Sequence, residues 1–285
     1  MKTIAIAGAS GFVGSYLAKF FEAKGYEIKP IGIETYLNEK LLQSIIEESS
    51  ILFNLSGANI AQRWSESYKK ILRDSRIDTT KKLVDAIKCS KNPPKLLVST
   101  SAVGIYTTNG SHDENRFEYS NDFLGQLCQE WESEAQKATE YGLRTAIFRF
   151  GVVLGKNGGA LSKMLPPFKM GLGGVISDGK APFPFIHIDD LARAYEFVIE
   201  NEKLDGVFNL VAPVQTTNEE LTKAIGKVLL RPTLFPVPAF VLKLIFGEGA
   251  TVLLDGQTVL PTRLLESGFE FNYPDINTAI KDVVN

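Results

Sequence analysis

Residues 1–150 alternate between short apolar runs and longer segments in which apolar residues recur every three or four positions. The apolar runs are continuous, as expected for strands that are covered on both faces of a parallel sheet. They predict strands over residues 3–7, 27–33, 51–55, 95–99 and 144–150. The amphipathic segments predict helices over residues 15–24, 39–48, 65–88 and 123–141. This alternation is typical of an α/β protein built on a doubly wound parallel sheet.

The chain changes character after residue 150. Residues 155–174 are rich in glycine and contain Pro166 and Pro167, which predicts loops around a short helix. Further helices are expected over 189–201 and 239–246 and from Thr216 onward, with a short strand over 207–210. We interpret these later elements as a smaller α+β lobe on the substrate side, not cleanly separated from the first part of the chain.

Composition narrows the class of protein. The 285 residues can bury a large core, and the net charge of −2 speaks against binding to nucleic acid or to an anionic membrane. No apolar run reaches membrane-spanning length, and Met1 leads directly into the first strand without a signal peptide. Two cysteines and two histidines predict neither a disulfide framework nor a metal site. We expect a cytoplasmic protein with a small-molecule substrate, and a homodimer is compatible with the sequence.

The strongest chemical signal follows the first strand, where glycines stand at positions 8, 11 and 14. Gly8 permits a tight turn, Gly11 lets the backbone approach a pyrophosphate, and Gly14 lets the next helix pack on the sheet. The alternative is a glycine turn that binds nothing. The motif predicts a Rossmann-type dinucleotide site whose cofactor-binding residues are Gly8, Ser10, Gly11, Phe12, Val13 and Gly14.

Domain boundaries follow from this assignment. We expect a dinucleotide-binding Rossmann domain over residues 1–155, to which residues 189–212 return. Residues 156–188 and 213–285 would then form the smaller lobe on the substrate side.

The choice of cofactor depends on the end of the second strand, where Ile33 and Glu34 stand. An acidic residue there would bind the ribose hydroxyls of NAD, whereas an arginine would accommodate the extra phosphate of NADP. Glu34 favours NAD mildly, but it is equally a candidate for a solvated loop residue. Arg73 or Arg76 could contact phosphate from another segment, so NAD and NADP both stay open.

Hydroxyl groups at the end of the fourth strand add a second group of candidates. Ser99, Thr100 and Ser101 would face the crevice in which ligands of open α/β sheets bind. Together with the glycine motif, they resemble the extended short-chain dehydrogenase/reductase superfamily. The resemblance places Leu55, Ser56 and Gly57 along the dinucleotide, and the segment 185–190 resembles the one that precedes a late helix in that superfamily.

A more specific resemblance covers residues 1 to about 280. It rests on segments 54–60, 63–64, 73–76, 127–132, 158–168, 171–174 and 259–265. These segments are similar to the SulA-like "epimerase family protein" branch, whose C-terminal domain has no known function. The resemblance implies an NAD(P)-binding nucleotide-sugar epimerase, dehydratase or oxidoreductase that acts on an unidentified small polar substrate.

The sequence departs from the superfamily at its acid/base pair. Ser101 matches the hydroxyl that polarises the substrate oxygen, but Phe123 and Leu127 stand where the resemblance implies a tyrosine and a lysine. Tyr106 or Glu132 could supply the proton instead, or the substrate could need little acid catalysis. The alternative is a non-catalytic NAD(P)-binding redox sensor or regulatory protein.

Polar residues outside these motifs are candidates for substrate binding. Lys163, Lys169 and Arg263 could bind an anionic substrate, although charged residues beside glycine loops are commonly solvated. Arg63 and Trp64 would lie over the substrate side of the cleft, or Trp64 would pack a helix start with Arg63 solvated. A structural role at the edge of the pocket is favoured for His187 over a catalytic one, and His112 is expected in a surface turn. The expected substrate-binding set is Asn59, Arg63, Trp64, Lys163, His187 and Arg263.

Overall fold

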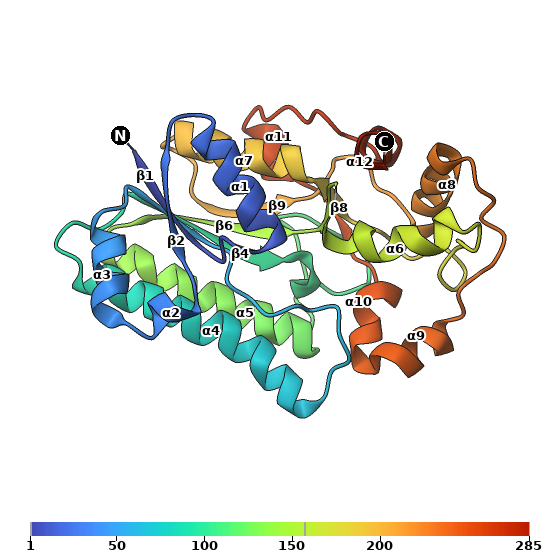
Figure 1. Ribbon diagram of the computed structural model, residues 1–285, viewed down its shortest axis with the longest axis horizontal. Helices are drawn as coiled ribbons and strands as arrows, with labels where there is room; N and C mark the ends of the chain where they lie inside the picture. Colours follow the sequence, from blue (N-terminus) through green and yellow to red (C-terminus); the bar gives the residue numbers. More distant parts are fainter. Residues whose placement is uncertain (1, 157, 285) are drawn as a thin grey trace.

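A six-stranded sheet forms the centre of the computed structural model, which describes residues 2–156 and 158–284 (Figure 1). The strand order is β2-β1-β3-β4-β6-β9, and every pair is parallel. The strands are β1 (Thr3–Ala7), β2 (Glu27–Ile31), β3 (Ile51–Asn54), β4 (Leu96–Ala102), β6 (Arg144–Phe150) and β9 (Gly206–Leu210). The doubly wound parallel sheet predicted from the sequence is confirmed.

Helices cover both faces of this sheet (Figure 1). One face is covered by α1 (Phe12–Glu22) and α7 (Ile188–Glu200), which share a core with the strands around Phe53 and Phe148. The other face is covered by α3 (Glu39–Glu47), α4 (Glu66–Cys89) and α5 (Phe123–Gln136). Burial on both faces explains why the strands are continuously apolar in sequence.

A second group of elements lies beyond the carboxyl ends of β4 and β6 (Figure 1). Its core joins β7 (Val152–Leu154), β8 (Phe185–His187), α6 (Gly159–Lys169), α8 (Asn218–Leu229) and α12 (Ile276–Val284). The outer elements are α9 (Ala239–Phe246) and α10 (Thr251–Leu254), whereas α11 (Thr262–Glu266) returns to the sheet, where Leu264 is buried in the same core as α7. A two-stranded ladder of β5 (Ser111–His112) and β10 (Thr258–Val259) connects this group to the sheet side.

Several elements differ from the sequence prediction. Helix α1 begins at Phe12 rather than at residue 15, because Gly11 takes the N-cap position. Strand β4 runs on to Ala102, so Ser101 lies within a strand. A four-residue helix, α2 (Ile33–Tyr36), follows β2 where strand was expected. In the described ranges, no helix is both long and apolar enough to cross a membrane.

Candidate functional site

The glycine loop between β1 and α1 has a geometry that only glycine satisfies at two positions. Gly8 has a φ of +82°, and a Cβ there would lie 2.8 Å from the Leu55 carbonyl oxygen. A Cβ on Gly14 would lie 2.2 Å from the Gly8 carbonyl oxygen. The loop is therefore pressed between the start of α1 and the end of β3, as the sequence motif requires.

The N-terminus of α1 offers a binding site for an anion. The first N–H groups of a helix lack acceptors within the helix, and no side chain caps this one. Its first turn contains no acidic residue, and Ser10 and Gly11 are exposed beside it. These donors fit a pyrophosphate, which would gain hydrogen bonds and the positive end of the helix dipole.

Phe12 connects the glycine loop to the lobe beyond the sheet. A Cβ on Gly155, Gly158 or Gly159 would lie 2.9 Å or less from the Phe12 ring. The absence of side chains at these three glycines therefore leaves the room that the Phe12 ring occupies. They belong to the glycine-rich segment that was predicted to form loops around a short helix. Val13, the next residue of α1, packs against the core of the sheet.

The loop after β3 forms the neighbouring wall of the site. The Ser56 Oγ lies 2.8 Å from the Tyr36 hydroxyl, and burial raises the pKa of that tyrosine to about 12. Gly57 is exposed, and a Cβ on it would lie 3.0 Å from the Arg76 guanidinium carbon. Leu55 continues the β1–β3 ladder by donating its N–H to the Ala7 carbonyl.

Arg76 and Arg73, the two candidates for contacting a phosphate, differ in their hydrogen-bond partners. The Arg73 guanidinium is already paired with the Glu130 carboxylate at 2.6 Å. Arg76 donates to the carbonyls of Leu72 and Ala58, at 3.1 Å each, and lies over the Trp131 ring. Burial lowers the pKa of Arg76, which means that it disfavours the charged guanidinium, and no carboxylate in the described ranges pairs with this group. An anion bound beside Arg76 would therefore stabilise its charge.

Ile33 and Glu34 begin the short helix α2 and are both exposed. The Lys82 ammonium reaches the other end of this helix, where it donates to the Tyr36 carbonyl at 3.1 Å. The end of β2 thus presents one carboxylate and one nearby ammonium to a ribose or to its phosphate.

The hydroxyls of β4 do not share one environment. Ser99 accepts a hydrogen bond from the buried Asn54 amide at 3.2 Å, and Thr100 lies 3.4 Å from the Tyr195 hydroxyl on the opposite face. Ser101 is buried beside the Cys128 thiol. Its Oγ makes no hydrogen bond to nitrogen or oxygen within the described ranges.

Apolar packing fills the positions where the superfamily's acid/base pair would stand. Phe123 contacts Trp64, with ring centroids 5.4 Å apart, and Leu127 is buried in the same cluster. The Trp64 indole donates to the Ile60 carbonyl at 3.0 Å, which fixes the ring over α5. A proton donor from these two positions is therefore absent.

Tyr106 lies at the centre of a buried polar network. Its hydroxyl accepts from Arg149 at 2.6 Å and donates to Asn209 at 2.8 Å. Arg149 also binds both carboxylate oxygens of Glu132, at 2.7 and 2.6 Å. Burial raises the pKa of Tyr106 to about 12, although Arg149 opposes that change.

His112 corrects the prediction of a surface turn. Its side chain is buried in β5 and stacks on Tyr106 at 5.1 Å between ring centroids. The Nδ1 atom accepts from the Glu118 N–H at 3.2 Å. No local pattern in the sequence indicates that His112 is buried, because β5 has only two residues and pairs with β10, which is distant in the sequence.

Four of the expected substrate-binding residues meet at the loop after β3. The Arg63 guanidinium donates to the Leu244 carbonyl at 2.8 Å, and the Lys163 ammonium to the Ala61 carbonyl at 3.4 Å. Trp64 forms a bridge with Gly247. The Asn59 carbonyl accepts from the Tyr68 hydroxyl at 2.6 Å, which places Asn59 on the same loop.

His187 and Arg263 lie elsewhere. The His187 Nδ1 accepts from the Asp189 N–H at 3.2 Å and so caps α7, while its ring stacks on Tyr273. Burial lowers the pKa of His187, against the opposing charge of Asp282. Arg263 donates to the Val207 carbonyl at 2.7 Å and lies over the Phe208 ring. Both side chains have structural partners.

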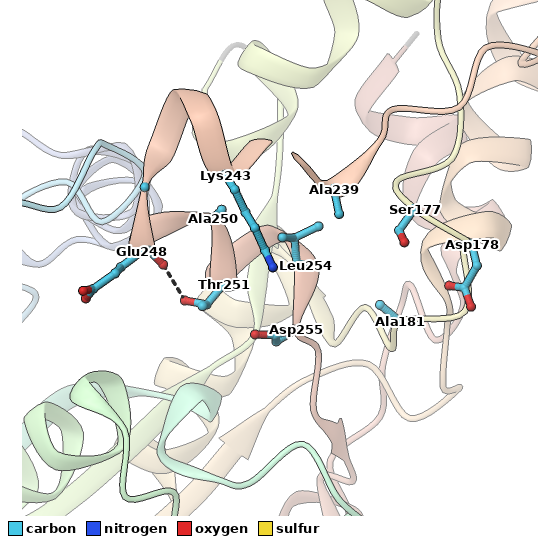
Figure 2. Close-up of a pocket in the computed structure, with 11 residues that line it drawn as sticks. Ser177, Asp178, Ala181, Ala239, Lys243, Glu248, Ala250, Thr251, Leu254 and Asp255 are labelled. Carbon is cyan, nitrogen blue, oxygen red and sulfur yellow. Dashed lines mark hydrogen bonds between the residues drawn. The ribbon is translucent and has the colours of Figure 1, made fainter. Parts of the chain in front are cut away.

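A cavity of about 550 Å³ lies between α9, α10 and the segment around Ser177 (Figure 2). Figure 2 shows the Lys243 side chain extending from α9 into this space, toward α10. Asp178 and Asp255 line the cavity from other segments. Gly247 also lines it and forms a bridge with Trp64, so the loop after β3 connects the cavity to the sheet edge that carries the glycine loop.

A glycine loop at the start of a doubly wound parallel sheet defines a Rossmann-type dinucleotide-binding protein. Two protein families match separate parts of the chain. Residues 4–211 match the NAD dependent epimerase/dehydratase family, and residues 237–283 match a domain of unknown function, DUF1731. The chain belongs to the NAD dependent epimerase/dehydratase family.

Relatives align along nearly the whole chain. The mouse epimerase family protein SDR39U1 is 37% identical over 291 residues, covering 99% of both chains. A chloroplastic homolog from Arabidopsis thaliana is 38% identical over 302 residues, covering 99% of this chain and 86% of that protein. The crystal structure of human SDR39U1 (isoform 2) with NADPH superposes with a TM-score of 0.90 at 32% identity, covering 99% of this chain and 98% of the human one.

Proposed function

We propose that this protein binds NAD or NADP along the carboxyl edge of its sheet and uses it to oxidise or reduce a small polar molecule. The observation that carries the proposal is the uncapped N-terminus of α1 above a turn that only glycine can form. The crystal structure of the human relative with NADPH supports the choice of a nicotinamide dinucleotide as ligand. When bound, the cofactor would supply the hydride carrier.

Each part of the site would have a separate role in binding the cofactor and the substrate. The α1 N-terminus would hold the pyrophosphate, and the loop of Ser56 and Gly57 would line the cofactor. The cavity around Lys243 would hold the substrate. A nucleotide sugar is the candidate, because a nucleoside-diphosphate sugar epimerase from Corynebacterium glutamicum is 28% identical, covering 99% of this chain and 58% of that one. Ser101 is the candidate, from the resemblance to the superfamily, for orienting the reacting oxygen; its Oγ is buried beside the Cys128 thiol, so substrate binding would have to expose it.

A non-catalytic regulator remains the second candidate, and one observation favours it. Phe123 and Leu127 fill the acid/base positions and are covered by Trp64. A protein that senses the redox state of the dinucleotide pool needs the binding edge but no proton donor.

Two measurements on one preparation separate these functions. Titration with NADH and NADPH, followed by nicotinamide fluorescence, tests binding. Absorbance at the nicotinamide band then tests net oxidation or reduction of a panel of nucleoside-diphosphate sugars, and NMR of the sugar products tests epimerisation or dehydration, which leave the cofactor unchanged overall. Turnover that Ser101→Ala lowers at unchanged cofactor affinity supports the enzyme, whereas binding without turnover supports the regulator. Absence of binding to either cofactor contradicts both.

Ile33→Arg is expected to shift cofactor preference toward NADPH by about tenfold, because one charge-assisted bond to phosphate contributes about 1.5–3 kcal/mol less its ordering cost. Ile33 is exposed at the end of β2, so the substitution adds a charge without disturbing packing. The ratio of the two dissociation constants measures the shift. Ile33→Gln is the uncharged control, and an equal ratio in both variants would place the phosphate elsewhere.

A further inference from the structure

Arg76 is a half-buried cation for which the described residues supply no counter-charge. Its guanidinium lies between the backbone of Gly57 and the ring of Trp131, whose centroid is 5.3 Å away. Burial lowers the pKa of Arg76, and the titratable side chains that act on it in residues 2–156 and 158–284, Cys128 and Tyr68, are not carboxylates. Removing a charge from water without a partner costs free energy, so such a group is typical of a site where a ligand supplies the missing charge.

The guanidinium also keeps hydrogen-bond donors for a ligand. One N–H donates to the Leu72 carbonyl and another to the Ala58 carbonyl, and no acceptor for the other N–H groups lies among the described residues. Gly57 is exposed, and a Cβ on it would lie 3.1 Å from Nη2 and 3.4 Å from Nε of Arg76. Glycine at this position therefore leaves the guanidinium uncovered on the side of the exposed loop. The Nε atom, which has no partner, is not sealed from solvent.

Arg76 lies on the side of this loop that faces away from the pyrophosphate site. It belongs to α4, which covers the opposite face of the sheet from α1 (Figure 1). The strand order is β1-β3-β4, so a ligand that extends from the glycine loop toward Ser101 on β4 crosses the loop after β3. Burial raises the pKa of the Cys128 thiol beside Ser101 to about 12, and the Arg76 charge opposes that change. Arg76 and Ser101 are therefore neighbours of the same thiol.

The loop after β3 also connects Arg76 to the cavity around Lys243. The loop runs from Gly57, against the guanidinium, to Trp64, which forms a bridge with Gly247 in the wall of the cavity. A molecule in the cavity and a group bound at Arg76 would thus lie along one segment of chain.

We propose that Arg76 binds an oxyanion of the substrate, a carboxylate or a phosphate group, and thereby defines the class of substrate that the site accepts. The inference rests on the proposed function, because it places the substrate beside a bound dinucleotide. A planar guanidinium binds two oxygens of a carboxylate or phosphate through parallel hydrogen bonds. An arginine stays protonated, so Arg76 would hold the charged group in place and would not exchange a proton with it.

A titration with inorganic phosphate tests the proposal on the protein loaded with NADPH. Trp131 fluorescence is the signal, in a Trp64→Phe background that leaves Trp131 as the sole tryptophan, and potassium chloride of equal ionic strength is the blank. The parent should bind phosphate saturably. Arg76→Gln should weaken this binding at least ~10-fold, the loss expected when charge-assisted hydrogen bonds are removed.

Arg73→Gln is the matched control, because it removes a guanidinium from the same helix that is half exposed and already paired with Glu130. It should bind phosphate as the parent does. Thermal unfolding checks that each variant is folded. If Arg76→Gln does not fold, Arg76→Lys decides the question, since a compact ammonium cannot bind two oxygens in parallel and should weaken phosphate binding at least ~3-fold.

Cofactor affinity separates the two sources of the oxyanion. The dissociation constants of NADH and NADPH should change less than ~3-fold in Arg76→Gln, because the pyrophosphate is expected at the N-terminus of α1. A loss of ~10-fold or more would assign Arg76 to a phosphate of the cofactor and overturn the proposal. Phosphate binding that is absent from the parent, or equally tight in Arg76→Gln, would overturn it as well.

The phosphate titration is repeated without cofactor, so that the two proposals fail separately. A parent that binds neither NADH nor NADPH contradicts the proposed function. The dependence of phosphate binding on Arg76 in the free protein then still decides whether this side chain is an anion receptor.

Discussion

Replacing Glu132 by alanine is expected to lower the free energy of unfolding by about 3–5 kcal/mol, the usual cost of leaving a buried charge without its partner. Glu132 and Arg149 are 6% and 2% exposed, and two hydrogen bonds join them. Burial alone would lower the pKa of Arg149, but the hydrogen bonds and charge of Glu132 outweigh it and raise that pKa. Removing the carboxylate leaves a buried cation whose remaining hydrogen-bond partners in the described residues are the hydroxyls of Tyr106 and Tyr119.

Urea unfolding of the variant and of a matched control gives the measurement. Glu130→Ala removes a carboxylate from the same helix, where the ion pair with Arg73 is about half exposed on both sides. Exposed pairs contribute about 0–1 kcal/mol, so this control should differ little from the parent. Equal losses in both variants would show that the buried pair does not account for the effect.

A double variant separates the charge from the packing. Glu132→Leu with Arg149→Met removes both charges and should lose less stability than Glu132→Ala, because no unpaired ion remains. Tyr106 and Tyr119 would each lose a hydrogen bond from Arg149, at 2.6 and 3.0 Å. The double variant therefore keeps a smaller cost, of about 1 kcal/mol for each lost bond.

The sheet and the glycine turn after β1 could be predicted from the sequence because both depend on local patterns. Continuous apolar runs identify strands buried on both faces, and the glycine spacing identifies the turn after β1. Gly8 and Gly14 stand where the backbone leaves no room for a Cβ. Such requirements act over a few residues, so a single sequence contains them.

The polar network around Tyr106 could not be predicted, because its members are distant in sequence. Arg149 comes from β6 and Glu132 from α5, and Asn209 joins them from β9. Tyr106 was a candidate proton donor on sequence grounds. Its place in this network favours a structural role, since its hydroxyl is saturated by two partners.

Gly11→Val is expected to weaken binding of NADH and NADPH by at least ~100-fold while leaving the protein folded. Gly11 is the N-cap of α1, with φ −73° and ψ 170°, an extended conformation that valine adopts readily. A Cβ there meets only the Gly8 carbonyl oxygen, at 3.3 Å. The side chain would instead project beside the free N–H groups of α1, in the space that the pyrophosphate needs.

Fluorescence quenching of Trp64 and Trp131 against added cofactor measures the affinities, and thermal unfolding checks the fold. Gly11→Ala adds a single carbon and should give an intermediate loss. Gly104→Ala is the control at a glycine outside the loop, where the added Cβ makes ordinary contact with Leu124 at 3.7 Å. If Gly11→Val binds either cofactor as tightly as the parent, the pyrophosphate does not lie on this loop. The proposed use of the sheet edge would then be wrong, although the fold would stand.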